Sequence, residues 1–219
     1  MRALILVDLQ YDFMPGGALA VPDGDAVVAV ANRLIPHFDL VVASQDWHPA
    51  NHGSFASQHA GKKPGDVIEL DGLEQILWPD HCVQHSLGAK LHRDLNSAGI
   101  DRMFQKGTDL RIDSYSTFFD NAHRKDTGLA EYLKQEGATG IFLMGLATDY
   151  CVKFSALDAR KLGFSTHVIE DGCRGIDLKP GDIARAFDAM RQAGVEIARS
   201  DELIRASSSA KARAGRGGR

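Results

Sequence analysis

Asp8, Lys106 and Cys151 each stand just after a different apolar run of the chain. Cys151 comes early in a stretch with helical spacing, where backbone N–H groups and the helix dipole favour a thiolate. A neighbouring ammonium would lower the pKa of this thiol, and a carboxylate could move protons. Together the three side chains indicate acyl transfer by a cysteine without a histidine. Taken singly, each has a plainer interpretation: a loop carboxylate, an exposed lysine and a buried structural cysteine.

A second group of side chains has the composition of a metal site. Asp46 and His48 stand close together in SQDWHPANH, and His52, His59, His81 and His85 follow them. Imidazole and carboxylate ligands suit zinc, iron or manganese. Neither an HExxH nor a CxxC pattern is present, so the chain is neither a zincin nor a zinc ribbon. The spacing alone does not say which histidines bind.

Other motifs of small-molecule enzymes are missing. The loop PGGALAVPDGD has no GxGxxG or phosphate-binding pattern, which argues against a nucleotide site. Cys151 does not begin the Cys-x5-Arg loop of a phosphatase, and Cys82 and Cys173 are expected to be structural. Phe13 and Leu19 could line a pocket, although either one alone is more often plain packing.

The apolar runs alternate with stretches of helical periodicity, which is typical of a parallel sheet with helices on both faces. Functional sites in such sheets gather at the carboxyl ends of the strands, where Asp8, Lys106 and Cys151 stand. We expect strands at 3–7, 40–43, 102–105, 140–144, 165–170 and 195–198. We expect helices at 25–38, 129–136, 149–162 and 182–193.

Two segments depart from this alternation. Residues 47–99 contain six of the nine histidines and both tryptophans, which argues for a functional loop rather than disorder. From Ala206 the sequence is small, basic and rich in Gly and Ser, which predicts a disordered tail over 206–219. We therefore expect a single domain over residues 1–205 with a metal-binding insertion at about 47–99.

The bulk composition narrows the class of protein. A chain of 219 residues, 44% of them hydrophobic, suffices for one α/β domain. The net charge of −4 gives no nucleic-acid footprint, so we expect no nucleic-acid partner. No apolar run approaches the roughly 18–20 residues of a membrane helix, and the first run is too short for a secretory signal. Three cysteines without paired spacing fit a reduced, cytoplasmic location.

Five motifs together resemble the nicotinamidases of the isochorismatase-like (cysteine hydrolase) superfamily, from about residue 2 to 205: VDLQYDF, SQDWHP, WPDHC, QKG and GLATDYCV. The resemblance implies a three-layer α/β fold around a six-stranded parallel sheet. It implies a catalytic triad that matches Asp8, Lys106 and Cys151. It also implies one divalent metal ion, zinc or else iron or manganese, held by ligands that match Asp46, His48 and His81. Whether His52 or His85 adds a ligand stays open.

The same resemblance implies further details of the site. A cis peptide would fall between Leu146 and Ala147, and the N–H groups of Ala147 and Cys151 would form the oxyanion hole. Pocket residues of the family match Phe13, Trp78 and Tyr115. The expected reaction is hydrolysis of nicotinamide to nicotinate and ammonia through a cysteine thioester, as a step of NAD salvage, with pyrazinamide as a second substrate. The chain is expected to be a monomer or a homodimer.

Four other interpretations remain open on the sequence. The chain could be another hydrolase of this fold, such as an isochorismatase or an N-carbamoyl amidase, although those relatives generally lack the metal ligands. It could be a metal-driven hydrolase in which Cys151 is idle, or a binding protein on an inherited scaffold. Its basic tail could bind nucleic acid, although a solvated tail is the simpler interpretation.

Overall fold

Six parallel strands form the central sheet of the protein, whose computed structural model describes residues 1–214. The spatial order of the strands is β5-β2-β1-β6-β7-β8, and every neighbouring pair is parallel. This confirms the predicted fold class. The strands are β1 (Arg2–Val7), β2 (Leu40–Asp46), β5 (Arg102–Lys106), β6 (Gly140–Leu146), β7 (Ser165–Arg174) and β8 (Glu196–Ala198).

The central strands are buried on both faces, which explains their unbroken apolar sequence. Every residue of β2 is buried, and so is all of β1 after its first residue. In the register of the sheet, Leu4 of β1 lies between Val41 of β2 and Phe142 of β6. The carboxyl ends of β5, β2, β1 and β6 therefore open at one edge of the sheet.

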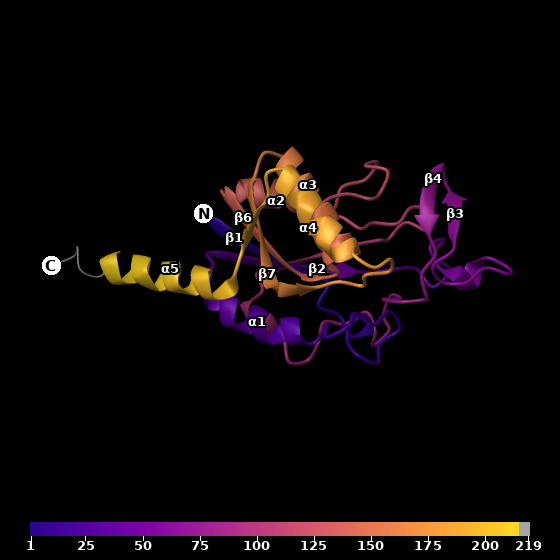
Figure 1. Cartoon of the computed structure of the whole chain (residues 1–219), viewed down its shortest axis with the longest axis horizontal. Helices are drawn as coiled ribbons and strands as arrows, with labels where there is room; N and C mark the ends of the chain where they lie inside the picture. The colour runs from indigo at the N-terminus through magenta and orange to yellow at the C-terminus, as the bar shows by residue number, and fades with distance from the viewer. Residues whose placement is uncertain (215–219) are drawn as a thin grey trace.

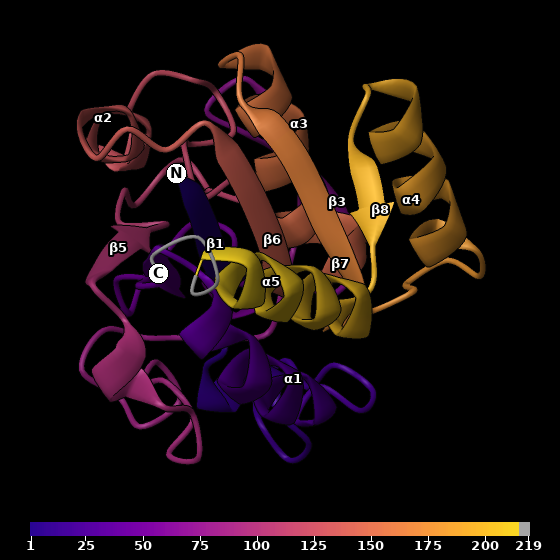
Figure 2. The ribbon, with the colours of Figure 1, turned by 90° about the vertical axis from the view of Figure 1, so that its left-hand side faces the viewer.

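Helices cover both faces of the sheet, as Figures 1 and 2 show. On one face lie α1 (Ala26–Leu34) and α5 (Ser200–Ala214); on the other lie α2 (Leu129–Gln135), α3 (Lys153–Lys161) and α4 (Asp182–Gln192). The first helix ends before the expected residue 38, because Pro36 belongs to a separate 3-10 turn (Ile35–His37). Within residues 1–214, no helix combines the length and apolar character needed to cross a bilayer.

The segment between β2 and β5 contains a hairpin that we did not predict. Strands β3 (Val67–Leu70) and β4 (Leu73–Ile76) pair antiparallel and stand apart from the central sheet (Figure 1). Asp71 and Gly72 connect them, both with positive φ, as a two-residue hairpin turn requires. An Asp-Gly pair is a recognised signal for such a turn, so the sequence did contain this information. Other parts of the segment form 3-10 turns at Ala56–Gln58 and Ser97–Gly99.

The expected disordered tail is wrong for residues 206–214, because α5 continues to Ala214. The helix begins at Ser200, whose backbone N–H and hydroxyl both bind the Asp171 carboxylate at 2.8 and 2.5 Å. Alanine, lysine and arginine are strong helix formers, so a helix started there can extend through a small, basic sequence. Residues 215–219 of the expected tail lie outside the described residues.

Candidate active site

Lys106 is the centre of a buried cluster of charged groups at the carboxyl edge of the sheet. Its Nζ lies 2.5 Å from Asp46 Oδ1, 3.0 Å from Asp8 Oδ2 and 3.4 Å from the sulfur of Cys151. The ammonium also donates to the carbonyl of Ser114 at 2.9 Å. Burial alone would lower the pKa of Lys106, but the two carboxylates hold it well above its ordinary value. Lys106 is therefore a fixed positive charge beside the thiol.

Asp8 follows β1 in a left-handed backbone conformation, with φ 52°. Its Oδ1 accepts a 2.6 Å hydrogen bond from the Ser44 hydroxyl, while its Oδ2 has no hydrogen-bond partner of good geometry. Burial raises the pKa of Asp8 above its ordinary value, and Asp46 adds to the rise while Lys106 opposes it. A carboxylate with a raised pKa, whose Oδ2 lies 3.0 Å from the Lys106 ammonium, is suited to taking and returning a proton.

Cys151 lies in a π-helical turn (Thr148–Val152) that precedes α3, where we expected the α-helix itself to begin. Such turns are often found at functional sites. The peptide between Leu146 and Ala147 just before it is cis, as the resemblance implied. Burial raises the pKa of Cys151 well above its ordinary value, with Lys106 opposing and Asp8 reinforcing the rise. Lys106 thus acts on the thiol pKa in the direction that we expected, but burial outweighs it, and the thiol needs a base.

Asp46, His48 and His81 form a group that fits a metal ion. The Nδ1 atoms of the two rings donate to the carbonyls of Gly107 and Pro79, at 2.9 and 2.8 Å. Both Nε2 lone pairs are thereby left facing Asp46 Oδ2, at 3.7 Å from His48 and 3.9 Å from His81. The Nε2 of His48 is buried with no hydrogen-bond partner. Lone pairs around a carboxylate repel one another unless a cation lies between them, so this donor set suits a divalent ion.

The glycine after Lys106 is required by this arrangement. Gly107 has φ +65°, and a Cβ on it would overlap the ring of His48. Lys106 and the carbonyl that orients the His48 ring are therefore placed by one tight turn.

The two other candidate histidines have different surroundings. His52 is buried, its Nε2 has no hydrogen-bond partner, and it forms a second possible metal group with His48 and Asp113. His85 packs against Trp47, with ring centroids 5.2 Å apart, and belongs to no metal-type group among the described residues. The structure thus leaves His52 as the additional candidate ligand and places His85 outside the cluster.

A small inner pocket lies beside Cys151 and the metal-type group. The four pocket residues that the sequence suggested, Phe13, Leu19, Trp78 and Tyr115, all line it. Its free volume is about 20 Å³, roughly the space of a single water molecule. Trp78 donates to the Tyr115 hydroxyl at 3.2 Å, which fixes the Tyr115 ring in the wall of this pocket.

Sequence reasoning missed several residues of the site. Asp113, Tyr150 and Ile176 also line the inner pocket. The Gln10 amide holds the backbone of Asp46 from both sides, donating to its carbonyl and accepting from its N–H, each at 2.8 Å. Gln10 stands inside the motif VDLQYDF, but the motif did not reveal this role.

Comparison with known proteins places this arrangement in a family. A family model described as the isochorismatase domain matches residues 2–202. This chain belongs to the isochorismatase family. Among curated relatives of this isochorismatase-family protein, the Escherichia coli K12 nicotinamidase is 56% identical over 200 residues, covering 90% of this chain and 93% of the relative.

Solved structures of isochorismatase-family members agree with the fold. A nicotinamidase/pyrazinamidase of Acinetobacter baumannii superposes with a TM-score of 0.89 at 48% identity, covering 92% of this chain and 97% of that one. A pyrazinamidase of Pyrococcus horikoshii in complex with zinc has a TM-score of 0.73 at 38% identity, covering 90% and 98%.

Proposed function

We propose that the protein hydrolyses nicotinamide to nicotinate and ammonia, as a step of NAD salvage, and also accepts pyrazinamide. The observation that carries this proposal is the position of Lys106 Nζ, 3.0 Å from Asp8 and 3.4 Å from Cys151, beside the pocket. The 56% identity to a relative named nicotinamidase supports the choice of substrate. A structurally similar protein named as a nicotinamidase and pyrazinamidase supports pyrazinamide as the second substrate.

In this proposal the Cys151 sulfur attacks the carboxamide carbon. The raised pKa of the thiol means that its proton must be removed as the sulfur attacks, and Asp8 is the base in reach. Asp8 then returns the proton to the leaving ammonia. Water attacks the resulting thioester, with Asp8 accepting one of its protons. The C–S bond then breaks, Asp8 returns that proton to the Cys151 sulfur, and the acid leaves as nicotinate after losing its remaining proton to solvent.

Backbone N–H groups and Lys106 stabilise the charges that develop. We assign the oxyanion hole to the N–H groups of Ala147 and Cys151, where the π-helical turn begins. Removal of one such donor typically costs about 10²–10³ in kcat. Lys106 offsets the negative charge that passes between the sulfur and Asp8.

Asp46, His48 and His81 would hold one divalent metal ion. When bound, such an ion would act as a Lewis acid that orients the pyridine ring and withdraws electrons from it. Phe13 and Trp78 would pack against the ring, and Leu19 and Tyr115 would complete the wall. The burial of these side chains excludes water from the reacting carboxamide.

The test is ammonia release from nicotinamide by the wild-type protein and by Cys151→Ala, each with and without a chelator. We expect the substitution to abolish turnover and the chelator to reduce it strongly. Cys173→Ala is the matched control, because Cys173 is a buried cysteine of β7 outside the site. It should retain turnover.

The alternatives give different results in the same assay. If the wild-type protein did not hydrolyse nicotinamide with metal present, the proposed substrate would be wrong. Amide substrates of other members of this family would then be assayed. Full activity of Cys151→Ala would instead indicate a metal-driven hydrolase with an idle cysteine.

A further inference from the structure

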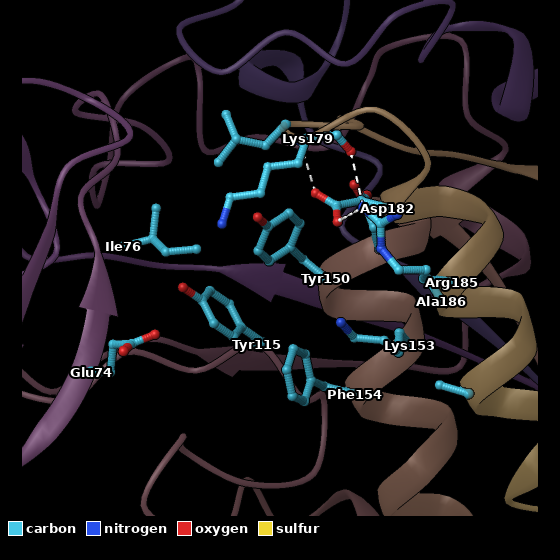
Figure 3. Close-up of a pocket in the computed structure, with 13 residues that line it drawn as sticks. Glu74, Ile76, Tyr115, Tyr150, Lys153, Phe154, Lys179, Asp182, Arg185 and Ala186 are labelled. Atoms are coloured by element: carbon cyan, nitrogen blue, oxygen red, sulfur yellow. Dashed lines mark hydrogen bonds and ion pairs between the residues drawn. The ribbon is translucent and has the colours of Figure 1, made fainter.

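A larger cavity lies just outside the inner pocket, between the β3–β4 hairpin and helices α3 and α4 (Figure 3). We call it the outer cavity. It has a volume of about 540 Å³, far larger than the free space beside Cys151. Its lining includes Glu74 and Ile76 from the hairpin, Lys153 and Phe154 from α3, and Lys179.

Two tyrosines form the wall between the cavities. Tyr115 and Tyr150 line both the inner pocket and the outer cavity, with ring centroids 5.5 Å apart. Both rings stand at the centre of the hollow in Figure 3. The inner pocket is too small for a pyridine ring as it stands, so a ligand must displace part of its wall. A ligand that moves past this wall enters the outer cavity.

The outer cavity is lined by three cations and by three carboxylates, Glu74, Asp149 and Asp182, and the cations differ in how they are paired. Arg185 pairs with Asp182 at 2.7 Å, and the Asp149 carboxylate accepts two backbone N–H groups. In contrast, neither Lys153 nor Lys179 has a salt bridge within the described part of the chain. Both amines extend into the hollow (Figure 3).

Lys153 has surroundings that suit an incoming anion. Its Nζ lies 4.5 Å from the centroid of the Phe154 ring and 5.8 Å from that of Tyr150. The Lys153 side chain is half-buried, so its ammonium group has exchanged part of its hydration for contacts with these aromatic rings. An aromatic ring that bears a carboxylate could stack beside these side chains and place its negative charge near the Lys153 ammonium.

We propose that the outer cavity is a product subsite, which holds an aromatic carboxylate by Lys153 and Lys179 after it leaves the inner pocket. This inference rests on the proposed function, because amide hydrolysis converts a neutral substrate into an anion. The lysines therefore distinguish the product from the substrate by charge. Retention of nicotinate there would make the product an inhibitor whose affinity depends on residues that never touch the reacting carbon.

The test uses Lys153→Met and Lys179→Met together, which keep the side-chain length and remove the charge. We expect the inhibition constant of nicotinate to rise about fivefold to tenfold, as loss of two partly screened ion pairs implies. The KM for neutral nicotinamide should change much less. Lys161→Met is the matched control: it removes the same charge from the same helix, where Lys161 pairs with Asp158 outside the outer cavity.

Calorimetric titration with nicotinate gives a second readout. The wild type should show a second binding event that the double variant lacks. A single binding event in both proteins, or an unchanged inhibition constant in the double variant, would overturn the subsite. If the wild type did not hydrolyse nicotinamide, the proposed function would fail instead. Binding of benzoate, an aromatic carboxylate without a ring nitrogen, would then still test whether the two lysines bind an anion.

Discussion

The inner pocket and the outer cavity share a wall of two tyrosines, but their charged groups are held in opposite ways. In the inner site Lys106 is buried and lies within 3.0 Å of two carboxylates. In the outer cavity Lys153 and Lys179 reach into the hollow, and no salt bridge fixes either amine among the residues whose side chains the structure describes. The charged groups of the inner pocket are thus paired with one another, whereas the two lysines of the outer cavity are available to a ligand.

This difference indicates two kinds of task. A dehydrated, mutually paired cluster changes little when a substrate arrives, which is what transition-state stabilisation requires. An open site with unpaired cations binds anions weakly and releases them quickly. Four substitutions test this difference between the two cavities, and we expect the largest effects in the inner pocket.

Lys106→Met should have the largest effect. It leaves the carboxylates of Asp8 and Asp46 buried without their cation, which typically destabilises a protein by roughly 3–5 kcal/mol. Activity should be lost as well. Chemical denaturation compares this variant with Lys161→Met, where an exposed lysine pairs with Asp158 and the loss should be about 0–1 kcal/mol. Equal stability of the two variants would contradict the buried cluster.

Asp8→Asn should separate chemistry from stability. The amide keeps the shape of the carboxylate but cannot accept the thiol proton, so kcat should fall about 10²–10⁴-fold. The loss of stability should be smaller than for Lys106→Met, because Lys106 retains Asp46. Steady-state kinetics and thermal unfolding measure the two effects, with the exposed Asp94→Asn as control. A kcat within threefold of wild type would exclude Asp8 as the base.

His48→Asn should remove bound metal. We expect about one divalent ion per chain in the wild type and a large reduction in the variant, with activity falling at least tenfold. His85→Asn is the matched control, since His85 lies outside the metal-type group and asparagine tolerates its positive φ of 67°. Elemental analysis of the purified proteins gives the metal content directly. An equal loss of bound metal in both variants would indicate general unfolding instead of the loss of one ligand.

Of the four substitutions, Tyr150→Ala should have the smallest effect on the hydrolysis of nicotinamide. Removal of the ring opens the wall, so KM should rise only about threefold to tenfold through lost packing. Amides with a substituted ring should become better substrates relative to nicotinamide. Tyr150→Phe keeps the ring and should resemble the wild type. An unchanged substrate preference in Tyr150→Ala would mean that this ring does not separate the two cavities.

The sequence predicted the triad because each of its residues stands at, or shortly after, the carboxyl end of a strand. Asp8, Lys106 and Cys151 end up together since parallel strands bring their carboxyl ends to one edge. Local patterns were enough for this. Local patterns did not identify His81 as a candidate metal ligand, because its spacing does not set it apart from the other histidines. Only the family resemblance selected it.

The outer cavity could not have been predicted in the same way. It forms where the hairpin meets α3 and α4, and no periodicity in the sequence relates Glu74 to Lys179. Asp113 lies in an irregular stretch with no strand or helix to place it. The raised pKa of Cys151 also depends on burial, which a motif cannot show.

The sheet order has a consequence for how activity develops during folding. Lys106 and Asp46 are 60 positions apart, and Lys106 and Cys151 are 45 apart, so the charged cluster is made entirely of long-range contacts. Forming such contacts requires closing long loops before any interaction is gained, which slows folding. A refolding chain should regain its helical circular dichroism first and its amidase activity last, when β5, β2, β1 and β6 are all in register.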